Sequence, residues 1–139
     1  MSTKKATLVV RTVTPSLVVM RESNDTPFDE EWDSFLALLK QNRDNFAKFR
    51  LLVVTDGGGP NAAQRKRLDA VLGGRPVRVA VVTDSAKSRF IASAISLINR
   101  DHRGFSLAEI EGAYGHLAFT PAERRLAEIA LREMDPLIK

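Results

Sequence analysis

Two apolar segments of nearly the same design limit what this 139-residue chain can fold into more than any other feature. Residues 49–56 and 78–84 are apolar at most positions, and each ends in Thr-Asp just before a helix-like stretch. Strands that are apolar on both faces are typical of a parallel sheet covered by helices. Thr55 and Thr83 lie 28 residues apart, which is about the length of one strand–helix unit. We therefore predict that the two segments are neighbouring parallel strands of an α/β sheet.

The residues before these strands predict an antiparallel hairpin and then a long helix. The runs 7–13 and 16–21 are rich in β-branched residues and are separated by Thr14-Pro15, a turn signal. Thr26, followed by a proline, is predicted to cap a helix that continues to about residue 46. Apolar residues recur at helical spacing along it and form one stripe facing the core. The residues of this stripe are Phe28, Trp32, Phe35, Leu36, Leu39 and Phe46.

Capping signals predict four more helices. The first ends at the Gly73-Gly74 pair, the second follows Ser85 as its N-cap, and the last two begin with capping boxes. A short strand is expected near Phe105. The expected helices span 61–72, 86–99, 106–117 and 120–134. The order β-β-α-β-α-β-α-(β)-α-α predicts a mixed, mostly parallel sheet of four to five strands with helices packed on it. One domain, 1–139, with a core over about 6–134, accounts for the whole chain.

The composition narrows the classes of function. Because the chain has no cysteine, we expect no disulfide, no thiolate chemistry and no cysteine-ligated metal. A net charge of +4 would suit a nucleic-acid binder, but the basic residues are interspersed with acidic ones, and the dense cluster 65–67 is interpreted as a solvated helix face. Nucleic acid is therefore not an expected partner. No apolar run reaches the ~18 residues of a membrane-spanning helix and no signal peptide is recognisable, so we expect no membrane insertion and a cytoplasmic location.

The tail 104–117 (GFSLAEIEGAYGHL) resembles the closing strand and helix of SpoIIAA-like anti-sigma-factor antagonists. Those proteins show an aromatic residue, a capping residue, an acid and a final apolar pair at these spacings. Together with the order of elements, this makes the chain similar to the STAS-like family from about residue 6 to residue 134. The resemblance implies a SpoIIAA-like fold and a small module that works by contact with another protein.

In regulatory members of that family, a serine or threonine after the third strand is phosphorylated and the modification blocks a partner kinase. Here glycines stand in place of the family's Asp-Ser-Ser/Thr-Gly motif, and Thr55 lies one residue too early. The resemblance therefore carries over the fold and a binding role without the phosphorylation switch. The same superfold includes lipid-carrying relatives, so an apolar ligand stays open.

The candidate binding residues follow the two duplicate strands, because open α/β sheets gather ligands at the carboxyl ends of their strands. The glycines 57–59 could present backbone amides to an anion, although a turn that needs a positive φ is the favoured interpretation. Asp56 and Asp84 are interpreted as helix-capping or loop residues. The candidates are Thr55, Asp56, Gly57, Gly58, Gly59, Asn61, Thr83, Asp84, Ser85, Lys87 and Ser88.

The residue pattern contains no recognisable catalytic site. Ser85 and Lys87 are two residues apart instead of the three of a Ser-x-x-Lys motif, so Ser85 is interpreted as a helix cap. His102 and His116 have no carboxylate or histidine at metal-ligand spacing and are interpreted as surface or structural residues. We therefore expect no metal, no cofactor and no enzymatic activity.

One helix suggests an interface. Residues 90, 91, 94, 95 and 98 are assigned to the core, which leaves 92, 93 and 96 as a small, uncharged outer face. This face is predicted to be either a homodimer interface or a surface buried beneath the C-terminal helix, whose apolar stripe includes Leu126 and Ile129. The leading hypothesis is a non-enzymatic regulatory or scaffolding module that binds another protein. The alternative is a domain that binds a nucleotide, anion or lipid at the loops 55–61 and 83–88.

Overall fold

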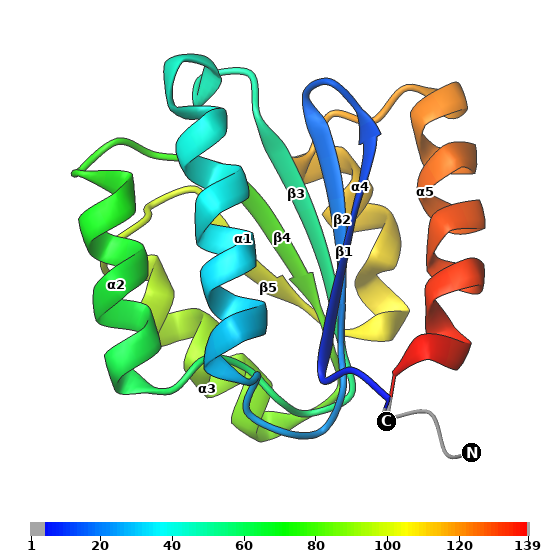
Figure 1. The fold of residues 1–139 in the computed structure, drawn as a ribbon. Coiled ribbons are helices and arrows are strands. Elements are labelled where there is room, and N and C mark those ends of the chain that lie inside the picture. The colour runs from blue at the N-terminus through cyan, green and yellow to red at the C-terminus, as the bar shows by residue number, and fades with distance from the viewer. Residues whose placement is uncertain (1–4, 139) are drawn as a thin grey trace.

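The computed structural model describes residues 5–138 as one sheet with helices on both faces (Figure 1). The first two strands pair antiparallel, and the others join them in parallel, in the spatial order β1-β2-β3-β4-β5. The strands are β1 (Leu8–Thr14), β2 (Leu17–Glu22), β3 (Arg50–Thr55), β4 (Arg78–Val82) and β5 (His102–Phe105). The predicted α/β class, the mixed sheet and the order of elements are confirmed.

Five helices complete the fold, and those that follow Ser85 and Thr120 start at the capping residues that the sequence predicts. The side chains of Asn61, Ser85 and Thr120 each accept a hydrogen bond from a backbone amide of the helix that they precede. Gly73, in the left-handed conformation, ends the second helix, as expected. The helices are α1 (Asp29–Gln41), α2 (Ala62–Leu72), α3 (Ala86–Ser96), α4 (Ile110–His116) and α5 (Pro121–Met134).

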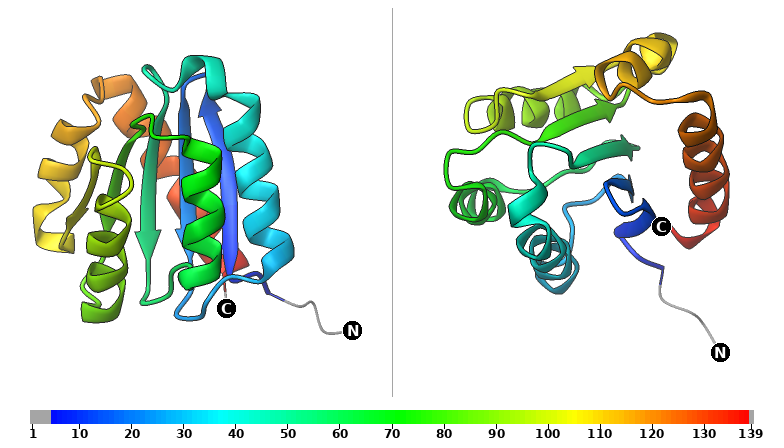
Figure 2. Two further views of the ribbon diagram at one scale, coloured as in Figure 1. Left: turned by 90° about the vertical axis from the view of Figure 1, so that its left-hand side faces the viewer. Right: turned by 90° about the horizontal axis from the view of Figure 1, so that it is seen from above.

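Side chains alternate across the strands and supply two separate cores. Met20, Val53 and Val81 belong to the core beneath α1, α2 and α3. Their strand neighbours on the opposite face, such as Leu52 and Ala80, belong to the core beneath α4 and α5. Figure 2 shows helices on both sides of the sheet. Because α3 and α5 lie on opposite faces, the C-terminal helix does not cover α3, and that part of the sequence interpretation is wrong.

The start of α1 differs from the prediction. Its N-cap is Phe28 instead of Thr26. The Pro27 carbonyl accepts a hydrogen bond from Gln64 Nε2 at 2.9 Å, which holds the chain outside the helix at this point. Glu31 accepts the Phe28 amide at 3.2 Å and thus replaces the expected threonine cap.

The end of α1 and the boundaries of two other helices also differ from expectation. α1 ends at Gln41 instead of residue 46, and a short 3₁₀ turn follows it. The helix expected from 106 begins as a 3₁₀ turn over Leu107–Glu109 before α4. α3 ends at Ser96 instead of residue 99, because Asn99 bonds the backbone amide and carbonyl of Val77 at 3.0 and 2.8 Å. None of the helices in the described part of the chain has both the length and the apolar character that a membrane crossing requires.

Candidate functional site

The two predicted loops meet at the carboxyl edge of the sheet. β3 and β4 are parallel neighbours, so Thr55 and Thr83 leave the sheet side by side. The Ser88 hydroxyl at the start of α3 donates a hydrogen bond to the Gly58 carbonyl of the other loop at 2.9 Å. The prediction that the duplicate segments are adjacent parallel strands with neighbouring exits is confirmed.

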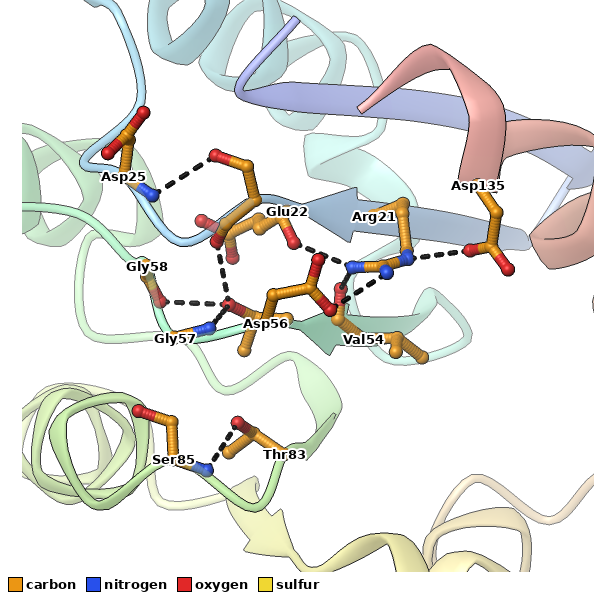
Figure 3. A network of polar contacts seen from close by, with 12 residues as sticks. Arg21, Glu22, Asp25, Val54, Asp56, Gly57, Gly58, Thr83, Ser85 and Asp135 are labelled. Atoms are coloured by element: carbon orange, nitrogen blue, oxygen red, sulfur yellow. Dashed lines mark hydrogen bonds and ion pairs between the residues drawn. The ribbon is translucent and has the colours of Figure 1, made fainter. Parts of the chain in front are cut away.

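The triglycine segment forms a buried and closely packed turn. Gly57 has a φ of +148°, in the region that favours glycine. A Cβ added to Gly58 would lie 2.1 Å from a backbone oxygen of the loop after β2. The Gly57 amide donates to Thr55 Oγ1 at 3.2 Å (Figure 3). The Gly58 amide donates to the Ser23 carbonyl at 2.9 Å. Because both amides are bonded within the protein, the structure favours a packing turn over an anion site.

The hydroxyl groups of the two loops also have structural partners. Thr55 Oγ1 donates to the Gly58 carbonyl at 3.0 Å, and Thr83 Oγ1 accepts the Ser85 amide at 3.0 Å. Ser85 Oγ in turn accepts the Ser88 amide at 3.2 Å, which makes Ser85 the N-cap of α3, as predicted. Each of these hydroxyls stabilises the strand-to-helix connection on which it lies.

The two aspartates serve different structural purposes. Asp56 forms an ion pair of 2.8 Å with Arg21, which also contacts Asp135 at 2.8 Å (Figure 3). These two ion pairs link β2 to the end of β3 and to the C-terminal turn. The sequence analysis did not predict them. Asp84 Oδ1 accepts the Leu107 amide at 3.0 Å, which is a loop hydrogen bond of the predicted kind.

The other candidates lie around this edge. Asn61 caps α2 through a 2.8 Å hydrogen bond from the Gln64 amide. Gly59 packs against Ile91 of α3, where an added Cβ would lie 3.0 Å from the side chain. Lys87 is exposed on the first turn of α3. Of the eleven predicted residues, four are exposed to solvent: Asp56, Asn61, Asp84 and Lys87. The others are buried or form hydrogen bonds within the turns.

A buried carboxyl group that the sequence interpretation missed lies beneath the same edge. Glu22, the last residue of β2, is 4% exposed, and its Oε2 has no hydrogen-bond partner among residues 5–138. Burial raises the pKa of this carboxyl from 4.5 to about 7. Strand alternation is the signal that could have found it, because Glu22 follows Val18 and Met20 at a period of two and so shares their core-facing side.

Glu22 lines a cavity of about 50 Å³ between the sheet and α1–α3. His102 also lines it; burial, with a smaller effect from His116, lowers the pKa of His102 from 6.5 to about 3. Like Glu22, His102 has one buried atom, Nε2, with no partner in the described structure. His116 contacts the Asp101 carbonyl through Nε2 at 2.8 Å. The two histidines therefore belong to different environments and do not form a pair of ligands.

The outer face of α3 carries large apolar side chains and differs from the small-residue face that the sequence predicts. Phe90, assigned to the core, is 73% exposed, whereas Ala92, assigned to the outer face, packs against the sheet. Leu97 is 87% exposed, and Ser93 lies between the two on the same face. Ala92 faces the sheet because α3 packs over β5 at Gly104, which has no side chain of its own there. An added Cβ on Gly104 would already contact the Ala92 Cβ at 3.7 Å.

Within residues 5–138, no three His, Asp or Glu side chains come together in a way that could hold a metal ion. Comparisons with protein-family models, with curated proteins and with solved structures found no match. The similarity to STAS-like domains therefore stays a prediction.

Proposed function

We propose that this chain is a non-enzymatic, STAS-like module that works by contact with another protein, and that the outer face of α3 is the contact surface. The observation that carries the proposal is the exposure of Phe90 and Leu97, at 73% and 87%. They lie seven residues apart, which is about two helical turns or roughly 10 Å along the axis. Exposed aromatic and aliphatic side chains on one helix face are the features that anchor protein interfaces.

The charges around this face indicate the chemistry of the partner. Residues 86–100 contain Lys87, Arg89 and Arg100 but no aspartate or glutamate. Arg89 pairs with Glu109 of the neighbouring turn at 3.5 Å, which leaves Lys87 and Arg100 as the cations of this segment. A partner with an apolar patch inside an acidic rim would complement both the apolar side chains and this charge. A two-fold dimer through α3 would instead bring basic side chains against basic side chains, because a two-fold axis pairs a surface with itself. We therefore propose that the partner is a different protein.

The strand-to-helix loops support the non-enzymatic part of the proposal. Thr55, Thr83, Ser85 and Ser88 use their hydroxyls to hold the loops and helix starts in place. The hydrogen bonds of Ser85 and Ser88 fix the start of α3 relative to the neighbouring loop. A helix held in place in this way loses little conformational entropy when its surface binds a partner. A cytoplasmic location belongs to the same proposal and is supported by the cysteine-free composition.

Affinity capture with quantitative mass spectrometry tests the proposal, with Phe90→Ser as the test variant and Leu126→Ser as the matched control. Leu126 is 45% exposed on α5, on the opposite face of the sheet. We expect wild type and Leu126→Ser to retain a common acidic protein that Phe90→Ser loses, and we expect salt to weaken the retention. Equal retention by all three proteins would contradict the proposal. A dimer seen by sedimentation velocity and lost in Phe90→Ser would replace the proposed partner with a second copy of this chain.

A further inference from the structure

The cavity between the sheet and α1–α3 extends from Glu22, at the carboxyl end of β2, to His102, at the amino end of β5, and combines apolar walls with an unmatched carboxyl group. Four polar side chains reach it: Glu22, Ser88, Asn99 and His102. Ser88 and Asn99 use their polar atoms in hydrogen bonds to the backbone of other segments. Glu22 Oε2 and His102 Nε2, in contrast, have no partner in the part of the chain that the structure describes. Leaving a buried acceptor unsatisfied is costly, so such groups indicate a missing donor.

Among residues 5–138, no lysine or arginine side chain lines the cavity opposite Glu22. Arg21, its neighbour in sequence, points to the other face of the sheet, where Asp56 and Asp135 hold its guanidinium. The other titratable side chain that the described residues contribute to the lining is His102, whose depressed pKa keeps it neutral. When Glu22 is ionised, residues 5–138 supply no positive partner for it, so a cation that enters the cavity would meet an unpaired carboxylate.

The size and walls of the cavity restrict what that partner is. A water molecule needs roughly 10–15 Å³ of such space, so about 50 Å³ accommodates a molecule of only a few heavy atoms. Trp32, Val53 and Ile91 are among the apolar side chains that would contact it. We propose that this cavity binds a small, mainly apolar primary amine, whose ammonium group pairs with the Glu22 carboxylate.

The protonation of Glu22 gives the proposal a pH dependence. An ammonium ion pairs with the ionised carboxylate, so binding below the raised pKa of Glu22 requires the carboxyl to release its proton. Affinity should therefore fall as the pH falls below about 7. His102 stays neutral over this range because its pKa lies near 3, so it does not contribute to the change.

The test uses n-propylammonium chloride as the probe, 1-propanol as its uncharged match, and sodium chloride as the salt control. Trp32 is the single tryptophan and lines the cavity, so its fluorescence reports occupancy directly. A ligand of about four heavy atoms is limited to a dissociation constant no tighter than roughly tens of micromolar. We expect n-propylammonium to change the Trp32 emission saturably near pH 8 and to raise the melting temperature. We also expect 1-propanol to bind about tenfold more weakly, because the hydrogen bond between ammonium and carboxylate is charge-assisted.

Variants distinguish the cavity from non-specific binding. Glu22→Gln should reduce the affinity for n-propylammonium about tenfold and leave the affinity for 1-propanol unchanged. Glu30→Gln removes an exposed carboxyl group of α1 that does not line the cavity, and it should bind n-propylammonium like the wild type. If Glu22→Gln does not fold, Glu22→Asp takes its place and should bind n-propylammonium measurably more weakly. An absence of saturable binding, or equal affinities in wild type and the carboxyl variants, would overturn the proposal and leave water as the occupant.

Discussion

Replacing Glu22 with glutamine should stabilise the protein at high pH and change its stability little at low pH. Burial raises the pKa of Glu22 from 4.5 to about 7, so between these values the native state keeps a proton that the unfolded chain has released. The native state therefore loses stability as the pH rises through this window, and the loss is complete above it. At about 1.4 kcal/mol for each unit of pKa, the full effect is about 3 kcal/mol.

Urea denaturation of wild type and Glu22→Gln at about pH 5 and about pH 8.5 measures this effect. The free energy of unfolding of the variant, relative to wild type, should rise by about 2 to 3 kcal/mol between the two conditions. His102 acts in the opposite direction, because its lowered pKa removes stability as the pH falls, but its contribution cancels in the difference between the two proteins. Glu30→Gln, at an exposed position on α1, is the control. A difference that stays constant with pH to within about 0.5 kcal/mol would refute the argument from burial.

Three further predictions concern the framework of the fold. Gly58→Ala should lower the free energy of unfolding by about 2 kcal/mol or more, because the added Cβ would meet a backbone oxygen. Gly115→Ala in α4 is the control: its Cβ has free space, so the change should be neutral or slightly stabilising. Equal melting temperatures of the two variants would contradict this prediction. Asn99→Ala should cost about 3 kcal/mol in urea denaturation, because a buried amide with three backbone hydrogen bonds is lost; a loss below about 1 kcal/mol would show that these bonds are weak. Arg50→Met should raise the pKa of Glu123, which the Arg50 guanidinium now holds at about 2. A carboxyl NMR titration measures this, and an unchanged value would assign the low pKa to the Thr120 cap instead.

Local signals explain which parts of the fold the sequence could predict. Asn61, Ser85 and Thr120 each mark a helix start through a hydrogen bond that depends on only a few neighbouring residues. The duplicate segments are apolar throughout, which is the pattern expected for strands with a core on each face. These features need no information about the rest of the chain, and they placed most elements correctly.

The features that the sequence interpretation missed depend on how distant segments pack. Glu22 is buried because the turn over 57–60 and α3 cover the end of β2. A glutamate at the end of a strand is otherwise commonly exposed, so its position in the sequence does not predict this burial. The orientation of α3, which exposes Phe90 and turns Ala92 toward β5, depends on how this helix packs on the sheet. The interpretation of Thr26 as a cap failed because Glu31, three residues beyond the true cap, supplied the acceptor instead.

Photo-crosslinking from position 90 tests the proposed contact surface most directly. The substitution Phe90→p-benzoylphenylalanine keeps an aromatic side chain where Phe90 is exposed, and the same replacement at Leu126 samples the far face. We predict a crosslinked product with a different, acidic protein from position 90 and none from position 126. Crosslinks from position 126 alone, or none from either position in cells that express the protein at its native level, would contradict α3 as the surface through which this module works.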